Sequence, residues 1–401
     1  EKEFEKFKNL VSERESREGL PELPNISKKG VVMRFAPSAS GPLHIGHALT
    51  ASISYLYFKK YGGKFYVRIE DTNPENIYAP SYEMIKKESD WLFKKQEKFL
   101  IQSEKMENYY KYAEKLINKK TAYICVCSQE KFKKFVDAKK NCPCRNNSKK
   151  KNLELRKKML SESKNNFKEG EAVLRFKSDM AHKNPAMRDF PLARINLHEH
   201  PKQGKKYRVW PLMNLAVAVD DIEQGMTHII RAKEHRDNAE RQKFIFKALG
   251  KKFPWTAYLG RWHFKDLHLS TTQMRKDIEA GKYKGWQDPR LPTIASLKKQ
   301  GYKPEAFWKF SEQVGLSETD KVISKEEYFK LKEKIIEHMR CTKEWGEYFP
   351  SSVSPFAYNE SMAQDYFPIT KEEALNAGYG WYDRPTRDYK ITKDVIQCTT
   401  Q

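Results

Sequence analysis

The segment from residue 31 to residue 69 contains two apolar runs joined by a turn rich in Gly and Pro and by a third, longer apolar run. Val31–Phe35 predicts a short buried strand, and the sequence FAPSASGPLHIGHA predicts a tight turn into a helix. We expect that helix over residues 48–61, ending at Gly62-Gly63, and a second strand over residues 65–69. A strand, a turn and a helix in this order are typical of the edge where an open α/β sheet binds phosphate.

Two histidines, His44 and His47, lie at the expected start of this helix. Three residues make nearly one helical turn, so both rings can point the same way. Free backbone N–H groups and the helix dipole make a helix N-terminus favourable for an anion. Imidazole N–H donors there suit a phosphate whose negative charge grows during nucleophilic attack. The alternative is that the two histidines only cap the helix or pack in the core.

Acidic residues follow two of the apolar runs. The strand expected at residues 65–69 ends in Glu70 and Asp71, at the strand end where parallel sheets bind ligands. Asp220 and Asp221 follow the apolar sequence LAVAV, at the end of a strand or helix. The sequence leaves two roles open for this second pair, which either orients groups of a site or caps the next element.

The charge of the chain indicates what kind of partner it has. A formal net charge of +23 favours a polyanion, most simply a nucleic acid. No apolar run reaches the length of a membrane span, and the first 30 residues have no signal-peptide pattern. We therefore expect a cytoplasmic protein with no membrane partner, in which six cysteines indicate a metal or free thiols rather than disulfides.

Four of the cysteines form two C-x-C pairs. Cys125 and Cys127 form the first pair, Cys142 and Cys144 form the second, and 14 residues lie between the pairs. Four thiolates suit a closed, tetrahedral structural zinc site. The surrounding segment, residues 121–205, has a Lys-rich stretch and no large apolar core, so a metal would help to stabilise it. Four free thiols are the alternative.

Several longer segments resemble the class I glutamyl-tRNA synthetases in their order and spacing. They are RFAPSASGPLHIGHA, GGKFYVRIEDTNPE, YRVWPLMNLAVAVDD, THIIRAKEHRDNAERQ and GWQDPRLPTIASLKKQGYKPEAFWKF. The sequences AYICVCSQEKF and EGEAVLRFKSDMAHKNPAMRDF resemble the archaeal branch in particular. The resemblance implies an α/β fold with a Rossmann-like parallel-sheet core, an inserted zinc-binding subdomain and a helical region after the core. It also implies ATP-dependent activation of glutamate as an adenylate and its transfer to the 3′ end of a tRNA.

The resemblance also implies a division of the chain. The expected parts are an N-terminal arm (1–30), the first half of the catalytic core (31–120), an inserted acceptor-arm subdomain with the cysteines (121–205), the second half of the core (206–264), a signature loop with a helical stem-contact region (265–340) and an unassigned C-terminal segment (341–401). In the second half of the core we expect strands at residues 208–210 and 228–231. ATP with Mg²⁺, structural Zn²⁺, glutamate and the acceptor arm of a tRNA are the implied ligands of a monomeric enzyme.

Individual residues match functional positions of the family. The positions that match ATP-binding residues are His44, Gly46, His47 and Ser270, of which His44, His47 and Ser270 are expected to be catalytic. The positions that match amino-acid-binding residues are Arg34, Ser38, Glu70, Met213 and Arg231. Both arginines would contact the substrate glutamate, since a guanidinium group binds a carboxylate through two hydrogen bonds. A surface charge or a weak ion pair is the alternative for each arginine.

Three features depart from the family pattern. The Met-Ser-Lys or Leu-Ser-Lys signature reads Leu-Ser-Thr, so Thr271 replaces the lysine that neutralises ATP phosphates. Lys265, Arg275 or Lys276 could supply that charge only if the loop were arranged differently. Met213 replaces a tyrosine whose hydroxyl helps to bind the amino acid. The C-terminal segment is too short for the two β-barrels with which archaeal relatives read the anticodon.

Two functions are therefore predicted as alternatives. The first is an ATP-dependent glutamate–tRNA ligase, which the HIGH sequence and both arginines favour. The second is a divergent or truncated paralogue without full aminoacylation activity, which binds RNA or adenylates another amino acid or acceptor. Thr271 and Met213 favour this second function.

Overall fold

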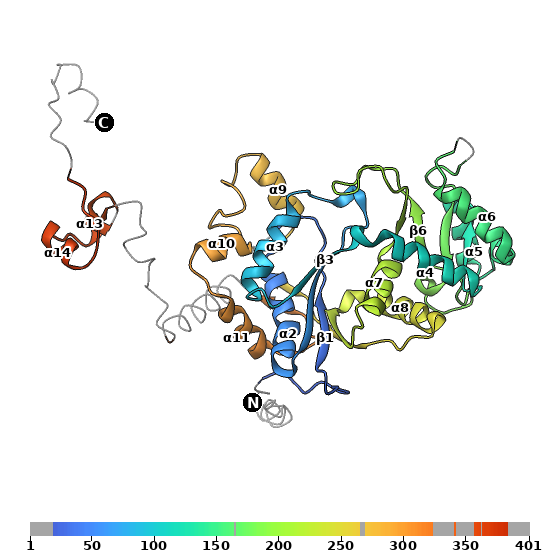
Figure 1. Cartoon of the computed structure of the whole chain (residues 1–401), viewed down its shortest axis with the longest axis horizontal. Helices are drawn as coiled ribbons and strands as arrows, with labels where there is room; N and C mark the ends of the chain where they lie inside the picture. The colour runs from blue at the N-terminus through green and yellow to red at the C-terminus, as the bar shows by residue number, and fades with distance from the viewer. Residues whose placement is uncertain are drawn as a thin grey trace, which may run out of the picture. The chain divides into compact units, whose positions relative to one another are not determined.

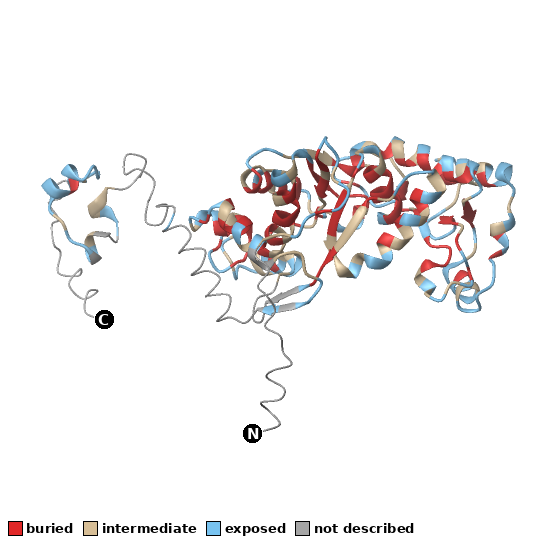
Figure 2. Cartoon of the chain, turned by 90° about the horizontal axis from the view of Figure 1, so that it is seen from below, coloured by how far each residue is buried: buried red, intermediate tan, exposed pale blue. Residues whose placement is uncertain are grey.

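The computed structural model describes residues 19–163, 166–264, 269–323, 341, 357–361 and 363–383 (Figure 1). By its internal contacts the chain divides into two compact units, Glu1–Ile335 and Ile336–Gln401. In the described part of the first unit, buried residues are concentrated in the strands and on the inward faces of the helices (Figure 2).

The core of the first unit contains parallel strands from two separate parts of the chain. In the first part, β1 (Val31–Phe35) pairs with β2 (Gly63–Ile69), and β2 pairs with β3 (Lys98–Ile101). In the second part, β8 (His228–Ala232) pairs with β9 (Trp255–Leu259). The parallel-sheet core expected from the sequence is confirmed, and the strand predicted at residues 228–231 is β8.

The two groups of strands meet between β1 and β8. The backbone N–H of Thr227 donates to the carbonyl of Val32 (3.0 Å), so β8 lies beside β1. From this junction the strand order runs to β2 and β3 on one side and to β9 on the other. Open α/β sheets bind ligands at the carboxyl ends of the strands where the order reverses in this way. Arg34 and Arg231 each occupy the fourth position of their five-residue strand, β1 and β8, close to that edge.

The helix α2 (Ile45–Tyr61) follows β1, as the sequence predicts. His44 is its N-cap residue, and its C-cap residue is Gly62, whose backbone φ is +69°. Gly63 begins β2 with a φ of +108°, and a Cβ atom there would lie 2.0 Å from the carbonyl oxygen of Val31. A side chain at this position would therefore prevent β2 from pairing with β1, and the Gly-Gly stop is required by the sheet.

Further helices pack around the sheet. They are α3 (Ser81–Leu92), α4 (Met106–Asn118), α7 (Met213–Glu223), α8 (Arg236–Leu249) and α11 (Pro304–Val314). The contact between α2 and α11 is specific, because the Ser311 hydroxyl donates to the carbonyl of Leu49 (2.9 Å). Tyr55 of α2 lies 5.1 Å from both Phe93 and Trp308 by ring centroids. This aromatic cluster fixes α2, and with it the two histidines at its start.

An antiparallel sheet lies between the two parts of the core in sequence. Its strands, in spatial order, are β4 (Ala122–Cys125), β5 (Val173–Phe176), β6 (Pro191–Ile195) and β7 (Val209–Pro211). The helices α5 (Gln129–Asp137) and α6 (Lys149–Leu160) lie beside this sheet, at one end of the unit (Figure 1). The strand expected in the core at residues 208–210 is β7, so its assignment to the parallel core was wrong. A short apolar run predicts a strand but not its partner, and β7 pairs with β6.

In the region after the core, the described residues 269–323 include three helices, and the rest of the region expected to be helical lies outside the described residues. It contains α9 (Thr271–Glu279), α10 (Ile294–Lys299) and α11, and β10 (Trp262–Phe264) pairs with β11 (Lys321–Ile323). Short 3₁₀ turns in the first unit are η1 (Pro74–Asn76), η2 (Gln102–Lys105), η3 (Pro143–Asn146), η4 (Pro185–Met187) and η5 (Lys233–His235). Within the described ranges, no helix has the length and apolar character needed to cross a membrane.

The second unit contains three short helical elements among its described residues. They are η7 (Tyr358–Glu360), α13 (Ala363–Tyr366) and α14 (Lys371–Asn376). Thr370 and Glu373 form a reciprocal cap at the start of α14, in which each side chain accepts a hydrogen bond from the other residue's backbone N–H (3.3 and 2.7 Å).

Candidate active site

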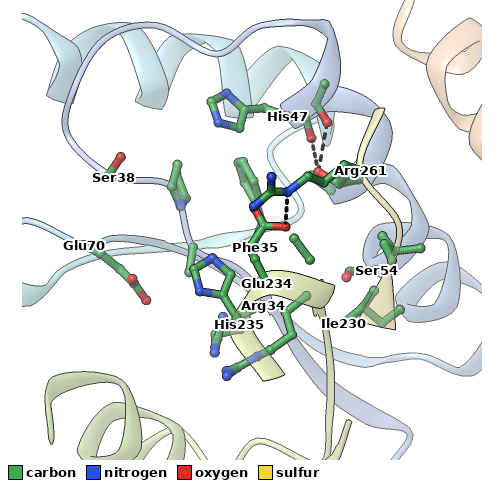
Figure 3. Close-up of a pocket in the computed structure, with 18 of the residues that line it drawn as sticks. Arg34, Phe35, Ser38, His47, Ser54, Glu70, Ile230, Glu234, His235 and Arg261 are labelled. Atoms are coloured by element: carbon green, nitrogen blue, oxygen red, sulfur yellow. Dashed lines mark hydrogen bonds and ion pairs between the residues drawn. The ribbon is translucent and has the colours of Figure 1, made fainter. Parts of the chain in front are cut away.

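A cavity of about 530 Å³ opens at the carboxyl ends of β1 and β8. Its walls come from β1, the loop after it, the start of α2, the end of β8, η5 and the segment between β9 and β10. Figure 3 shows His47, Arg34, Glu70 and Arg261 around this space, and they come from α2, from β1, from the residue after β2 and from the segment between β9 and β10. The cavity is lined by eight of the residues that the sequence analysis singled out: Arg34, Ser38, His44, Gly46, His47, Glu70, Met213 and Arg231.

His44 and His47 stack on each other at the tip of α2, with ring centroids 3.8 Å apart. Burial lowers the pKa of His47 to about 4, and burial together with the neighbouring His47 ring lowers the pKa of His44 well below its ordinary value. The Nδ1 atom of His47 accepts from the backbone N–H of His44 (3.4 Å), so the proton of this neutral ring is on Nε2. The Nδ1 atom of His44 is buried and has no hydrogen-bond partner in the part of the chain that the structure describes. The pair is thus neutral at pH 7 and has hydrogen-bonding capacity left for a ligand.

The loop that presents the histidines is held by groups far away in the sequence. The backbone N–H of Leu43 donates to the Glu88 carboxyl group (2.6 Å). The backbone N–H of Ile45 donates to Pro292 O, and that of Ile294 donates to Leu43 O, each at 2.9 Å. Burial raises the pKa of Glu88 to about 8, although the hydrogen bonds that it accepts from backbone N–H groups act in the opposite direction. The start of α2 is therefore fixed before any ligand binds.

Arg34 is held by a buried carboxylate. Its Nε and Nη2 atoms donate to the two oxygens of Asp221, at 2.7 and 3.2 Å. Arg68 donates to the same carboxylate through Nη1 (2.7 Å). Burial alone would raise the pKa of Asp221, but the charges of Arg34 and Arg68 outweigh it and lower the pKa to about 2. Of the two roles left open for Asp221, the structure supports the orienting one, because it fixes two guanidinium groups beside the cavity.

Asp220 has a separate set of partners on the other side of Arg68. It accepts hydrogen bonds from Gln102 Nε2 (2.9 Å) and from the Tyr109 hydroxyl (3.0 Å), and it lies 3.6 Å from Arg68 Nε. Burial raises the pKa of Asp220, and the charge of Arg68 acts against this shift. Arg68 in turn reaches Glu70 with Nη2 (3.3 Å). Asp220 therefore also orients the site, through Arg68 and Glu70.

Arg231 differs from Arg34 in its partners. Its Nη1 donates to the neutral side chain of Gln242 (3.1 Å), and no carboxylate among the described residues forms an ion pair with it. Burial and the nearby charge of Arg34 lower the pKa of Arg231 to about 10, while Asp221 acts in the opposite direction. Arg231 therefore lines the cavity as a cation that no carboxylate of the described residues contacts directly.

Ser270 is the one expected site residue of this set that does not line the cavity. It is exposed and caps α9, because its hydroxyl accepts from the backbone N–H of Gln273 (3.3 Å). Its neighbour Leu269 does line the cavity. Thr271 packs against Gly41 and lies 3.5 Å from the Ser40 hydroxyl. Lys265, one of the expected substitutes for the missing lysine, lies outside the described residues.

Three ionisable residues of the cavity wall, Glu234, His235 and Arg261, were not singled out from the sequence. Arg261 forms an ion pair with Glu234 through Nε (2.9 Å), and this pair is drawn in Figure 3. His235 lies beside them, and its pKa is lowered by burial and by the charge of Arg231. The sequences RAKEH and LGRW carry these residues, but only the fold brings the two segments together.

The four predicted cysteines form one cluster. Their Sγ atoms all lie within 4.8 Å of one another, and the Cys142 Sγ is 3.6 Å from that of Cys125 and 3.4 Å from that of Cys127. The Sγ atoms of Cys127 and Cys144 are 3.8 Å apart. A tetrahedral zinc with Zn–S bonds of about 2.3 Å requires S–S separations of about 3.8 Å, so the cluster fits this ion. Burial raises the pKa of the Cys127 thiol to about 11, so a bound cation would have to stabilise its thiolate.

The chain is similar in sequence and in fold to known proteins. This chain is 43% identical to the glutamate–tRNA ligase of Methanobrevibacter smithii over 326 residues. It is 45% identical to the glutamate–tRNA ligase of Pyrococcus horikoshii over 323 residues. These matches cover 81% and 80% of this chain but 58% and 56% of the relatives, so the chain spans less than two thirds of their length. A crystal structure of a glutamate tRNA ligase from Elizabethkingia meningosepticum has a TM-score of 0.58 at 20% identity, covering 86% of this chain and 76% of that one.

The family profile decides the assignment. The family described as tRNA synthetases class I (E and Q), catalytic domain, matches residues 30–338, which include both groups of parallel strands and the antiparallel sheet between them. The match therefore includes every residue named above as lining the cavity or forming the cysteine cluster. The chain belongs to the class I tRNA synthetases of the E and Q group and contains their catalytic domain.

Proposed function

We propose that this chain is an ATP-dependent glutamate–tRNA ligase, which activates glutamate as an adenylate and transfers it to the 3′ end of a tRNA. The observation that carries the proposal is a single cavity in which neutral imidazoles lie at a helix N-terminus and a guanidinium group has no carboxylate partner among the described residues. The first feature suits a nucleotide phosphate, and the second suits an acidic amino acid.

Glutamate would bind on the side of the cavity formed by β1 and β8. Arg231 would hold a carboxylate of the substrate, because it has a neutral partner and faces the cavity. The Nη1 group of Arg34 is not committed to Asp221 and would contribute a further N–H donor. Glu70 and Ser38 line the same part of the wall and would bind the ammonium group.

ATP would bind at the tip of α2, with its phosphates against His44, Gly46 and His47. Mg²⁺ would accompany the nucleotide and neutralise part of its phosphate charge. A carboxylate oxygen of glutamate attacks the α-phosphorus, the new O–P bond forms, and pyrophosphate leaves. His47 Nε2–H and the unpaired His44 ring would donate to phosphate oxygens as their charge grows. Catalysis would thus depend on positioning and charge stabilisation, without a covalent enzyme intermediate.

The second step would use the same cavity. A ribose hydroxyl at the 3′ end of the tRNA attacks the carbonyl carbon of the adenylate, and AMP leaves as the ester bond forms. The antiparallel sheet with its cysteine cluster would contact the acceptor arm, and Zn²⁺ bound by Cys125, Cys127, Cys142 and Cys144 would stabilise it structurally. The proposed enzyme is a cytoplasmic monomer.

A second candidate function is a synthetase-derived module that does not complete aminoacylation. Thr271 favours it, since a hydroxyl lies where the family has a phosphate-binding lysine, and this hydroxyl faces Ser40. Arg261 lines the cavity and offers another cation, although Glu234 partly neutralises it. The positive charge on this side of the cavity is therefore smaller than in the family pattern.

Amino-acid-dependent exchange of labelled pyrophosphate into ATP tests both functions. The assay uses the full chain with each of the acidic and amide amino acids, with and without tRNA. Exchange with glutamate, followed by transfer of labelled glutamate to tRNA, supports the ligase. Exchange with glutamate but no transfer supports an adenylating paralogue, and no exchange with any amino acid supports a binding module.

A further inference from the structure

We propose that Gln242 determines the preference of the cavity for an acidic substrate, because its neutral amide orients Arg231 without neutralising it. The inference rests on the proposed function and names a residue to which the sequence analysis gave no role. Gln242 is a positioning residue that acts through Arg231, although part of its side chain also lines the cavity.

The amide of Gln242 is fixed by hydrogen bonds at both ends. Gln242 lies on α8 and is 1% exposed. Its Oε1 accepts from Arg231 Nη1 (3.1 Å), and its Nε2 donates to Asn214 Oδ1 on α7 (3.4 Å). Asn214 is itself only 7% exposed. Because the amide nitrogen faces Asn214, the amide oxygen must face the arginine.

A neutral partner leaves Arg231 in need of an anion. The two carboxylates whose charges act on Arg231, Asp221 and Glu70, already have arginine partners. Asp221 is bonded to both Arg34 and Arg68, and Glu70 lies 3.3 Å from Arg68 Nη2. The positive charge of Arg34 acts against that of Arg231, and this repulsion adds to the cost of burying the guanidinium group. A ligand carboxylate would remove both penalties, whereas a ligand amide would remove neither.

The chemistry at position 242 therefore controls which ligand is favoured. A carboxylate there would form an internal ion pair with Arg231 and would repel a substrate carboxylate. An amide satisfies one N–H of Arg231 and leaves its charge available. A cavity built around an unneutralised cation rejects a neutral substrate of the same shape, since the cation would then stay buried and unpaired.

A purely structural role is the competing explanation. Gln242 and Asn214 connect α8 with α7, so removing the amide could loosen the cavity as a whole. A loosened cavity would bind ATP and glutamate less well together. A charge effect would change glutamate binding alone and would differ between glutamate and glutamine.

The test compares Gln242→Glu, which keeps the shape and adds a charge, with Gln242→Met, which removes the hydrogen bonds and adds no charge. The readouts are KM for glutamate and ATP in pyrophosphate exchange, and binding of glutamate and glutamine by calorimetry. We expect Gln242→Glu to raise KM for glutamate at least about tenfold, with KM for ATP within about twofold. It should also lower the ratio of glutamate to glutamine affinity by about tenfold. Gln242→Met should weaken glutamate binding yet keep that ratio.

Several outcomes would overturn the inference. One is a Gln242→Glu protein with the wild-type ratio of glutamate to glutamine affinity, and another is equal damage to ATP and glutamate binding in both variants. A wild-type chain that binds both amino acids equally would also overturn it. If Gln242→Glu does not fold, Asn214→Leu, which releases the amide, should raise KM for glutamate alone. A wild-type chain that prefers glutamate in calorimetry but shows no exchange would contradict the proposed function and leave the role of Gln242 supported.

Discussion

Arg34 and Arg231 occupy equivalent positions in the neighbouring strands β1 and β8, but their side chains have different hydrogen-bond partners. Arg34 is bonded through two of its nitrogens to Asp221, whereas Arg231 is bonded to the uncharged amide of Gln242. The sequence analysis assigned both to substrate binding. We propose Arg231 as the main anion-binding cation, whereas the hydrogen bonds of Arg34 to Asp221 hold the wall of the cavity.

We predict that Arg34→Met lowers the free energy of unfolding by about 3 kcal/mol. The reason is that the buried carboxylate of Asp221 would lose one of its two guanidinium partners and keep only Arg68. Urea denaturation measures the change. Lys60→Met is the matched control, since Lys60 pairs with Glu22 at the exposed surface, and this variant should unfold like the wild type. Equal stability of Arg34→Met and wild type would contradict the structural role of Arg34.

Glu88 gives a prediction about pH at the same scale. Its folded pKa of about 8 is far above its ordinary value, so the folded chain holds a proton that the unfolded chain releases. The resulting stabilisation is complete below about pH 4.5 and is lost as the pH rises through 8. We expect the free energy of unfolding of wild type to fall relative to Glu88→Gln over this range, by at most about 1.4 kcal/mol per pH unit. Parallel pH profiles of the two proteins would refute this.

At the scale of elements, the N-terminus of α9 lies against the loop that leads into α2. Thr271 contacts Gly41 there, which places the departure from the family signature beside the loop that precedes the histidines. We predict that Thr271→Lys lowers KM for ATP by two- to tenfold, corresponding to at most about 1.4 kcal/mol of added binding, because it adds a cation near the phosphates. Thr271→Met, of similar length and without charge, is the control. If both variants have the same KM for ATP, the added charge has no effect at this position.

The cysteine cluster is a second element whose stability can be measured. We expect about one zinc ion per chain, bound by four thiolates. Cys142→Ser should lose the metal and lower the melting temperature, while Cys341→Ser, at an exposed cysteine outside the cluster, should retain both. Elemental analysis and thermal unfolding give the two readouts. A Cys142→Ser protein with its zinc intact would exclude the proposed ligand set.

For the whole molecule, the positive charge is unevenly distributed along the chain. Residues 121–205 carry 21 Lys and Arg against nine Asp and Glu, which is about half of the net charge of +23. The helix α6 alone exposes Lys149, Lys150, Lys151, Lys157 and Lys158. The segment with the cysteine cluster is therefore the most strongly basic of the expected parts.

This distribution predicts a steep dependence of tRNA binding on salt. Each neutralised phosphate contributes about −0.7 to −0.9 to the slope of log affinity against log salt concentration. Six phosphate contacts would therefore give a slope of about −4 or steeper. Fluorescence titration of tRNA between 50 and 200 mM salt measures the slope. The rate of glutamate-dependent pyrophosphate exchange without tRNA should depend much less on the salt concentration. A slope flatter than about −2 would contradict a polyanion interface on this scale.

The first strand, the helix with two histidines and the Gly-Gly stop follow from the sequence alone, because their causes are local. Apolar spacing, a helix start and the backbone freedom of glycine act within a few residues. The two C-x-C pairs also predicted a cluster of four thiols, because a structural metal site commonly takes its ligands from two pairs of closely spaced cysteines. Structure and sequence agree for these parts, from Val31 to Ile69 and at the cysteines.

What the sequence left open depends on contacts between residues far apart along the chain. Asp221 meets Arg34 across 187 positions, and β7 pairs with β6 in an antiparallel sheet. Gln242 follows Arg231 by only 11 positions, but their side chains meet only because the chain turns between β8 and α8. Whether a charged side chain binds a substrate or a neighbouring residue depends on which opposite charge lies within hydrogen-bond distance. Spacing along a chain does not contain that information, because burial and partner choice are properties of the packed molecule.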